Sequence, residues 1–294
     1  MGDQVDRGRT PLRCWVPLMF EPIEHYLELV RTMDALGYEG AALADHVAVP
    51  ERFASVHPSG DNPFTPRSEF PDPLTLAPAM AAVTQRLRIM SYVFVLPMRD
   101  PLLVAKQVGT LAALFPDRFC FGVGAGWLLE EIASVGVDPA TRGARMDEML
   151  EVIGQALDTG WVEHHGEHFD IDRAGVFPVP ASRPPVWVGG KSLAAQRRAV
   201  RQDGWLGMNY GLDEVEALVA RLGRLREEAG DDRDDFEVFV VPNAMPTAQL
   251  HADLAGMGVT STMVMPWIPG DPAMTDLEAK RDALAALADT LGLA

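Results

Sequence analysis

The chain alternates between strand-like and helix-like segments from end to end, and this alternation limits its fold more than any single motif does. Eight short strand-like segments, most of them apolar and the second made of small residues, are each followed by a helix-like stretch. The expected strands span 12–20, 39–46, 87–96, 118–126, 186–190, 204–209, 236–241 and 261–267. The expected helices span 23–36, 74–84, 100–114, 143–159, 192–202, 213–229, 247–257 and 275–291.

Eight strand–helix units within 294 residues are typical of a (β/α)8 barrel, the TIM barrel. A doubly wound sheet also alternates strands and helices, but it seldom has eight regular units of this length. Two stretches depart from this alternation of strands and helices. A long Pro-rich loop at 47–73 follows the second strand, and 161–185 before the fifth strand suggests a hairpin with a Pro-rich return. We expect one α/β barrel domain over 1–294 with these two insertions.

The overall composition excludes several classes of protein. The net charge of −17 is spread along the chain and argues against nucleic acid, which demands clustered Lys and Arg. No apolar run approaches the roughly 18 residues of a membrane span, and the N-terminus lacks the apolar core of a secretory signal. A cytoplasmic location is therefore expected. Cys14 and Cys120 are too few for a disulfide framework or a metal cage, and we expect buried thiols.

In a TIM barrel the active site lies where the strands end, at the carboxyl face. The second expected strand ends in Asp45-His46. Imidazole titrates near neutral pH and can transfer a proton or orient a polar substrate atom. The alternative is a structural histidine whose hydrogen bonds are satisfied within the protein. Successive strand residues point to opposite faces, so Asp45 and His46 need not touch each other.

The fourth strand leaves through a glycine-rich segment, Gly122-x-Gly124-x-Gly126, that looks at first like a dinucleotide loop. The GxGxxG fingerprint requires a third glycine where this chain has Trp127 or Leu129, so the fingerprint fails. Glycines at alternate positions instead leave one face of the strand exit without side chains. Either a flat ligand or another stretch of backbone could then approach closely.

The fifth strand ends in Gly189-Gly190-Lys191-Ser192, directly before a helix. Free N–H groups at that helix start, together with a hydroxyl and an ammonium group, would suit a phosphate. The alternative is a glycine turn in which Ser192 caps the helix. The P-loop spacing GxxxxGK[ST] is absent.

Two further groups of titratable residues have two interpretations each. His164, His165 and His168 invite a metal site, but the helical HExxH arrangement is absent. We favour exposed histidines on a hairpin and expect no metal. Glu130 and Glu131 could reach the pocket, or could simply occupy the first turn of a helix, where the helix dipole favours acids.

Five segments in this order and spacing resemble the bacterial luciferase-like flavin oxidoreductase superfamily, and within it the branch that uses the deazaflavin coenzyme F420. They are LGYEGAALADH, RLRIMSYVFVLPMRDPLLVAKQVGTL, RFCFGVGAGWLLEEI, HHGEHFDI and PPVWVGGKSLAAQRRAVRQDGWLGMN. The resemblance runs from about residue 12 to 290. Each motif alone is moderate evidence, but together they are specific for the superfamily. They do not identify a substrate.

The resemblance implies hydride transfer between F420 and a small organic substrate, with His46 and Asp45 as catalytic residues. It also implies a non-prolyl cis peptide at Tyr92-Val93, behind the coenzyme ring. The residues implied to contact the cofactor are Asp45, Tyr92, Val93, Gly124, Ala125, Gly126, Gly189, Gly190, Lys191, Ser192, Met208 and Asn209. The substrate pocket is expected to include His57, Trp127 and Glu130. Family members are often homodimers, so a homodimer is expected.

Two departures from the family's pattern bear on the substrate. Trp127 stands where the sugar-phosphate dehydrogenases have a catalytic carboxylate, and the substrate-phosphate lysine after the sixth strand is missing. Glucose 6-phosphate is therefore not expected as a substrate. Phe53, Phe64 and Phe70, together with Trp127, favour an apolar or aromatic one. An FMN-dependent monooxygenase is the alternative enzyme, and a non-catalytic ligand-binding paralogue is the alternative of another class.

Overall fold

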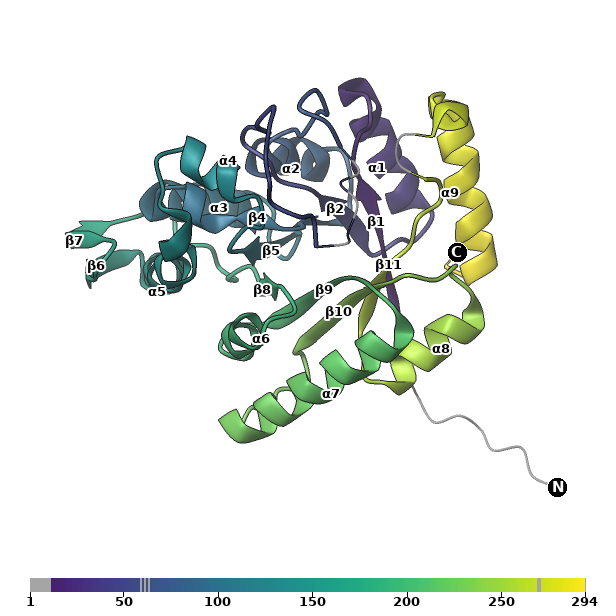
Figure 1. Cartoon of the computed structure of the whole chain (residues 1–294). Coiled ribbons are helices and arrows are strands. Elements are labelled where there is room, and N and C mark those ends of the chain that lie inside the picture. Colours follow the sequence, from purple (N-terminus) through teal and green to yellow (C-terminus); the bar gives the residue numbers. More distant parts are fainter. Residues whose placement is uncertain (1–11, 59, 61, 63, 269–270, 294) are drawn as a thin grey trace.

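The computed structural model describes residues 12–58, 60, 62, 64–268 and 271–293. Within them, eight parallel strands close into a barrel in the order β1-β2-β3-β5-β8-β9-β10-β11 and back to β1 (Figure 1). The strands are β1 (Arg13–Leu18), β2 (Gly40–Leu43), β3 (Arg88–Ser91), β5 (Phe119–Gly124), β8 (Val186–Gly189), β9 (Gly204–Tyr210), β10 (Glu237–Pro242) and β11 (Ser261–Met263), and a short strand β4 (Phe94–Val95) continues β3 along β5. The predicted TIM barrel is confirmed.

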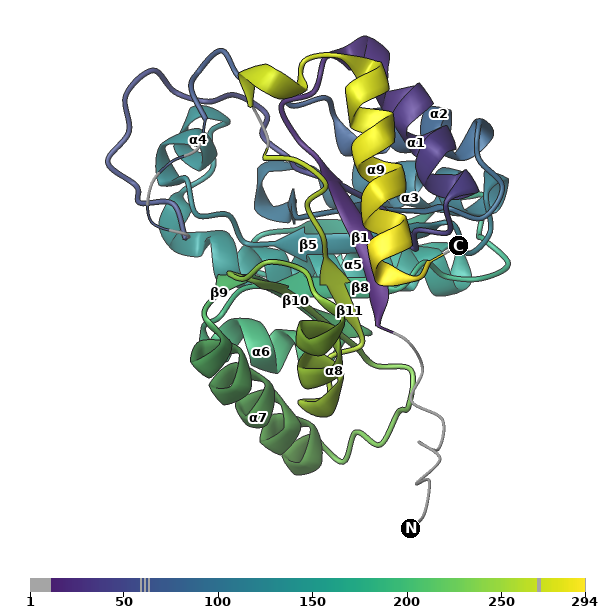
Figure 2. The ribbon, with the colours of Figure 1, turned by 90° about the vertical axis from the view of Figure 1, so that its right-hand side faces the viewer.

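Helices surround the barrel (Figures 1 and 2). They are α1 (Tyr26–Ala35), α2 (Pro73–Ala82), α3 (Pro101–Leu114), α4 (Leu129–Ser134), α5 (Arg142–Thr159), α6 (Leu193–Val200), α7 (Leu212–Ala229), α8 (Ala248–Gly256) and α9 (Leu277–Leu291). Short 3-10 turns lie at Ile23–His25, Leu96–Met98, Pro139–Thr141 and Pro272–Met274. Several helices begin at a side chain that accepts a backbone N–H, such as Asp72 before α2 and Asp100 before α3, which explains why their starts could be predicted. No helix in the described residues is long and apolar enough to cross a bilayer.

The inside of the barrel is filled by buried side chains, to which every one of the eight strands contributes. They are Trp15, Ala42, Met90, Cys120, Trp187, Leu206, Phe239, Val241 and Met263. A larger apolar layer separates the strands from the helices. Cys14 and Cys120 are buried free thiols, as predicted, and burial raises the pKa of both to about 12, so neither is a reactive thiolate.

The third strand is not continuous, in contrast to the single strand expected over 87–96. Met90 of β3 pairs with Cys120, whereas Phe94 of β4 pairs with Val123, so the β3–β4 segment contains one more residue than β5 over this stretch. This extra residue makes a bulge in the barrel wall. The Tyr92-Val93 peptide within it is cis, as the resemblance implied.

The two insertions leave the barrel at different places. The loop 47–72 passes beside α4, at the upper left of Figure 2. The predicted hairpin is confirmed as β6 (Trp161–His165) and β7 (Asp170–Gly175), two antiparallel strands that project away from the barrel at the left of Figure 1.

A buried ion pair attaches the C-terminal helix to the loop after β1. The Lys280 ammonium on α9 donates to the Glu21 carboxylate, and both side chains are almost fully buried. The second oxygen of Glu21 accepts the indole N–H of Trp267 at 2.9 Å. Figure 2 shows α9 lying along β1 and α1, where this contact secures it. The pair therefore fixes the loop after β1, whose Phe20 faces the site described below.

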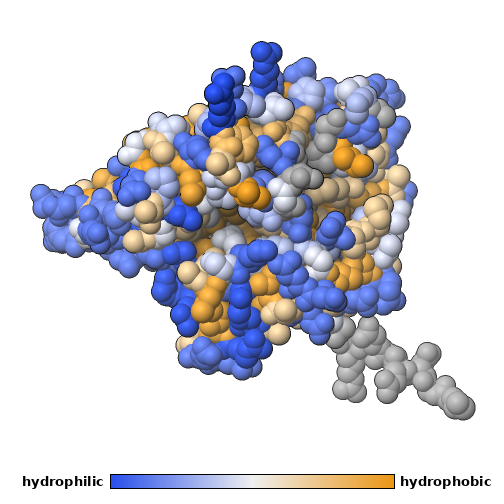
Figure 3. Space-filling view, in the orientation of Figure 1, coloured by the Kyte–Doolittle hydropathy of each residue, from blue (hydrophilic) through white to orange (hydrophobic). Residues whose placement is uncertain are grey.

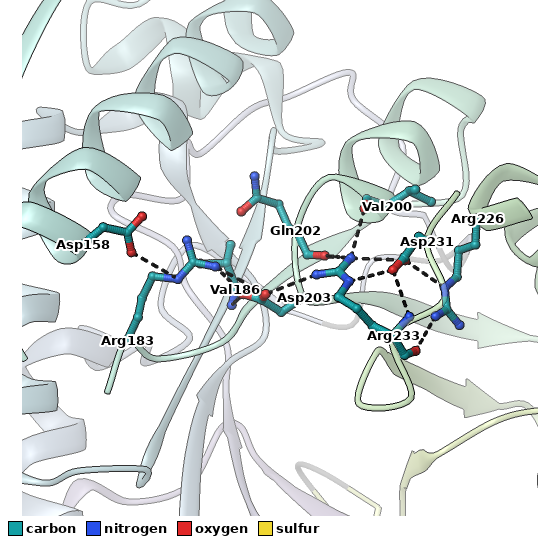
Figure 4. A network of polar contacts seen from close by, with 9 residues as sticks. All are labelled: Asp158, Arg183, Val186, Val200, Gln202, Asp203, Arg226, Asp231 and Arg233. Carbon is teal, nitrogen blue, oxygen red and sulfur yellow. Dashed lines mark hydrogen bonds and ion pairs between the residues drawn. The ribbon is translucent and has the colours of Figure 1, made fainter. Parts of the chain in front are cut away.

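A network of charged residues stabilises the amino end of the barrel (Figure 4). Asp231 accepts hydrogen bonds from Arg226 at 2.9 Å and from Arg233 at 2.6 Å. The Arg233 guanidinium also donates to the carbonyl oxygens of Val200 and Gln202. Hydrogen bonds from Arg233 and then Arg226 hold the pKa of the Asp231 carboxyl well below its ordinary value. This network ties the end of α7 to the turn before β9.

Asp231→Asn is expected to lower the free energy of unfolding by about 2 kcal/mol at pH 7, because charge-assisted hydrogen bonds to a largely buried carboxylate are lost. The folded-state pKa of Asp231 is depressed, so its contribution is present above the pKa of the unfolded chain and is lost as the pH falls. The difference between variant and wild type should therefore shrink below about pH 4. Urea unfolding from pH 3 to 7 measures this. Asp232→Asn, at the exposed neighbour, is the control, and an equal effect of both variants would contradict the prediction.

Candidate active site

His46 lies just beyond the end of β2 and pairs with a carboxylate from another part of the chain. Its Nδ1 atom is 2.7 Å from Oε2 of Glu131, which lies on α4. The His46 side chain is 9% exposed and that of Glu131 only 2%. The other carboxylate oxygen accepts the backbone N–H groups of Val47 at 2.6 Å and Ala48 at 3.1 Å. Helix α4 thus holds both the imidazole ring and the start of the loop that follows it.

Asp45 and His46 have different partners and do not contact each other, although β2 ends at Leu43, before both of them, and not at His46 as expected. One carboxylate oxygen accepts the N–H of Val95 at 2.7 Å, and the other lies 2.6 Å from Arg99. Burial raises the pKa of Asp45, while the Arg99 guanidinium and the Val95 N–H oppose that shift. Both oxygens are engaged by the protein. These contacts hold β4 in place, and the catalytic and cofactor-contacting roles of Asp45 stay predictions.

The space left by the glycines of the fourth barrel strand is occupied by the neighbouring strand segment. A Cβ atom at each alternate glycine would collide with an alternate residue of the β3–β4 bulge. The pairs are Gly122 with the Ser91 carbonyl oxygen, Gly124 with Val93 Cγ2 at 2.6 Å, and Gly126 with Val95 Cγ1 at 2.6 Å. Of the two alternatives drawn from the sequence, close approach of protein backbone accounts for Gly122, and the valine side chains account for the other two. Ala125 lies half-buried between them.

The segment between β8 and α6 has the features of a helix start. Ser192 Oγ accepts the N–H of Ala195 at 3.1 Å, so the helix cap that the sequence offered as the alternative to a phosphate site is present. Gly190 has φ +125°, a conformation that favours glycine. The Lys191 side chain is 55% exposed, and its ammonium lies 3.1 Å from Glu214. Gly189 faces Val93, whose Cγ1 would lie 2.8 Å from an added Cβ. Val93 thus packs between the ends of β5 and β8.

The other predicted cofactor contacts lie on the bulge and at the end of β9. Tyr92 packs on Phe239 with ring centroids 5.4 Å apart, and its hydroxyl donates to the Gly207 carbonyl oxygen. Burial raises the pKa of Tyr92 well above its ordinary value. Met208 is half-buried and Asn209 is exposed.

An aromatic cluster packs against His46 and covers it. The His46 ring centroid is 4.6 Å from that of Phe70 and 4.8 Å from that of Phe64. His57 packs edge-on against Trp127 with centroids 4.9 Å apart, and burial lowers the pKa of His57. The complete cluster is Phe20, His46, Phe53, His57, Phe64, Phe70 and Trp127. The loop 47–72 and the ends of three strands therefore form one aromatic wall.

Glu130 does not contact His46. Its carboxylate accepts the N–H groups of Ala54 at 2.7 Å and Ser55 at 3.2 Å, and the Ser55 hydroxyl at 2.6 Å. The Ser55 hydroxyl and then the Ala54 N–H lower the pKa of Glu130 to about 2. Its contacts fasten the loop, which differs from the pocket-lining role predicted from the sequence. Glu131 is the residue that meets His46; the sequence analysis considered both glutamates but included only Glu130 in the expected pocket. Neighbouring helix residues point in different directions, and nothing local shows which of the two faces the barrel.

A cavity of about 570 Å³ lies at the opposite end of the barrel, around the first residues of the strands. The three arginines that line it are each paired with a carboxylate. Arg13 lies 2.5 Å from Glu237, Arg88 lies 3.0 Å from Glu39, and Arg183 lies 3.2 Å from Asp203. These pairs close the amino end of the barrel, where stabilising contacts are expected and chemistry is not.

The hairpin histidines take part in ordinary polar contacts. His164 Nε2 is 3.2 Å from Glu148, and His165 Nδ1 is 2.6 Å from Asp170. In the part of the chain that the structure describes, no group of three His, Cys, Asp or Glu side chains is arranged to hold a metal ion.

The fold and the site together define a parallel β/α barrel whose polar groups gather beyond the carboxyl ends of the strands, as in TIM-barrel enzymes. Residues 4–248 match the family described as luciferase-like monooxygenase, and the chain belongs to this family. The family includes F420-dependent and FMN-dependent oxidoreductases.

Relatives by sequence agree with this assignment, and a solved structure shares the fold. An uncharacterized protein of Mycobacterium tuberculosis (Rv0940c) is 39% identical over 243 residues, which cover 81% of this chain and 84% of that protein. The F420-dependent glucose-6-phosphate dehydrogenase of Mycolicibacterium fortuitum is 27% identical over 229 residues, 75% of this chain and 64% of the relative. The monooxygenase RslO1 of Streptomyces bottropensis has the same fold, with a TM-score of 0.75 at 18% identity over 95% of this chain and 98% of that one.

Proposed function

We propose that this chain is an oxidoreductase that transfers a hydride between the deazaflavin coenzyme F420 and a small organic substrate. The observation that carries the proposal is the buried pair of His46 and Glu131 at the carboxyl face, 2.7 Å apart. It presents an imidazole that can move a proton where a barrel enzyme performs its chemistry. The F420-dependent dehydrogenase of Mycolicibacterium fortuitum, a relative by sequence, supports the choice of coenzyme.

The residues between β8 and α6 fit a coenzyme phosphate. The Ser192 cap leaves further N–H groups of the first helical turn without an intrahelical partner, and these favour an anion. Lys191 is exposed and can exchange Glu214 for a phosphate oxygen. Figure 3 shows a hollow in the surface between α4, which carries Glu131, and α6, which follows Ser192. When bound, the deazaflavin supplies the hydride chemistry that no amino-acid side chain provides.

The chain's own residues would orient the substrate, exclude water and move its proton. Trp127 and the phenylalanines of the aromatic wall offer apolar surface next to His46. Trp127 cannot act as an acid or base. We therefore propose a small apolar or aromatic alcohol or ketone as the substrate, in preference to a sugar phosphate.

Fluorescence titration of the purified chain with F420, and separately with FMN, tests the proposal. We expect micromolar binding of F420. Binding of FMN without F420 would replace the proposal by an FMN-dependent monooxygenase. Failure of both to bind would favour a non-catalytic paralogue. Turnover with secondary alcohols, measured against glucose 6-phosphate, then tests the substrate class.

Lys191→Ala is expected to weaken F420 binding about tenfold, because one charge-assisted contact to the phosphate is lost. The same titration measures the dissociation constant. Lys106→Ala is the matched control, since Lys106 lies on α3 and donates to the Phe177 carbonyl oxygen. Equal dissociation constants for wild type and Lys191→Ala would remove Lys191 from the coenzyme site.

A further inference from the structure

Within the described residues, the carboxylate of Glu131 directs its hydrogen bonds to three consecutive residues, His46, Val47 and Ala48. The side chain is 2% exposed, so bulk water does not compete for these contacts. One oxygen holds the backbone beyond β2, and the other faces the imidazole. This arrangement fixes the position of the ring and also its chemical form.

The contact decides which ring nitrogen carries the hydrogen. A carboxylate only accepts hydrogen bonds, so Nδ1 of His46 must be the donor. In a neutral imidazole the other nitrogen, Nε2, is then an acceptor with a free lone pair. The hydrogen bond that His46 makes with Glu131 uses Nδ1 and leaves Nε2 uninvolved. The nearest rings, Phe64 and Phe70, offer it no competing polar hydrogen.

We propose that Glu131 is a positioning residue that holds His46 with its hydrogen on Nδ1, so that Nε2 receives the hydroxyl proton of the substrate. The proposal rests on the proposed function. The O–H bond of the substrate breaks as an Nε2–H bond forms, and the electron pair left on oxygen completes the carbonyl as the carbon loses its hydride to the deazaflavin. The carboxylate of Glu131 then balances the charge of the imidazolium. In the reverse direction the same proton returns from Nε2.

The adjacent carboxylate offers a matched control. Glu130 lies on the same turn of α4 and also holds the loop after β2, but it does so through Ala54 and Ser55. Glu130→Gln therefore weakens an attachment of the same loop without changing the group that faces His46. An effect confined to Glu131→Gln separates control of the imidazole from general support of the loop.

Long-range proton–nitrogen NMR of the full chain, with its histidines labelled with ¹⁵N, tests the proposal without coenzyme or substrate. The chain has seven histidines, and loss of one set of signals in His46→Asn assigns His46. We expect Nδ1 to have the shift of a protonated ring nitrogen and Nε2 that of a bare one. In Glu131→Gln the side-chain amide can donate to Nδ1, so the hydrogen should move to Nε2. Glu130→Gln should match wild type.

Steady-state kinetics test whether the tautomer of His46 affects turnover. Glu131→Gln should lower turnover about 100-fold with coenzyme affinity within about twofold, and adding it to His46→Asn should cost no further turnover. A wild-type hydrogen on Nε2 would overturn the proposal even if the variant does not fold. An unchanged tautomer in Glu131→Gln, or an inverted one with full turnover, would also overturn it. Wild type without turnover on any alcohol or ketone would reject the proposed function, while the NMR result still decides the tautomer.

Discussion

Gly122→Ala is expected to lower the free energy of unfolding by about 3 kcal/mol or more. The added methyl group would run into the carbonyl oxygen of Ser91 and would lie 2.9 Å from Leu206 Cδ1. The backbone around Ser91 belongs to the barrel wall and cannot rotate away as a flexible side chain could. Gly122 pairs with Trp187 in the middle of the barrel, so strain there would spread to the strands on both sides.

Gly154→Ala is the matched control, because Gly154 lies within α5 and an added Cβ would meet nothing within 4 Å. Alanine there should stabilise the chain by about 0.5–1 kcal/mol, since it favours the helix and restricts the unfolded chain. Urea unfolding of the two variants and wild type measures both effects. If Gly122→Ala were as stable as wild type, the close packing of the bulge against β5 would be incorrect.

The barrel could be predicted from the sequence because its signals are local. Most helices carry an apolar stripe, and several carry a capping residue, within one short segment, and most strands carry an apolar run. The last strand was overestimated, since only Ser261–Met263 form β11 within the predicted 261–267. Val264 and Trp267 continue the apolar run and are buried, but they lie beyond the end of β11, and Val264 keeps one backbone hydrogen bond, to Trp15 of β1. Composition alone does not distinguish a residue inside a strand from a buried apolar residue just beyond it.

The purpose of the glycine run could not be decided locally, because it depends on register between two strands. The alternate spacing of Gly122, Gly124 and Gly126 shows that one face is bare. The filling of that face by the β3–β4 bulge follows from the pairing of residues 30 positions apart. The same glycine spacing fits both a nucleotide loop and a close-packed strand. Only the register of the paired strands in the folded protein distinguishes the two.

The candidate site likewise has some features that could be predicted from the sequence and others that could not. The sequence indicated that Asp45 and His46 need not touch each other, and their partners differ. The partners of each come from distant segments, Arg99 for one and Glu131 for the other, and no periodicity links them. Phe53, Phe64 and Phe70 were predicted near the substrate from their apolar character alone. The loop that carries them has no repeating pattern, so their gathering around His46 is visible only in the structure.

The catalytic role proposed for His46 has a direct kinetic consequence. His46→Asn should lower turnover by about 10²–10⁴-fold, the usual contribution of a positioned proton-transfer group. Asparagine is the better substitution because its side-chain amide can still donate to the Glu131 carboxylate. Alanine would leave that buried carboxylate without its side-chain partner and would open a cavity beside Phe64 and Phe70. The variant removes Nε2 while the wall and the loop keep their support.

Coenzyme affinity separates a chemical effect from a structural one. The F420 dissociation constant of His46→Asn should stay within about twofold of wild type, because a group needed only for proton transfer lowers turnover without weakening binding. His165→Asn, at an exposed histidine of the β6–β7 hairpin, should change neither quantity. Steady-state rates and fluorescence titration on the three proteins measure both. Equal losses of turnover and affinity would mean that His46 shapes the coenzyme site. Full turnover would exclude it from proton transfer.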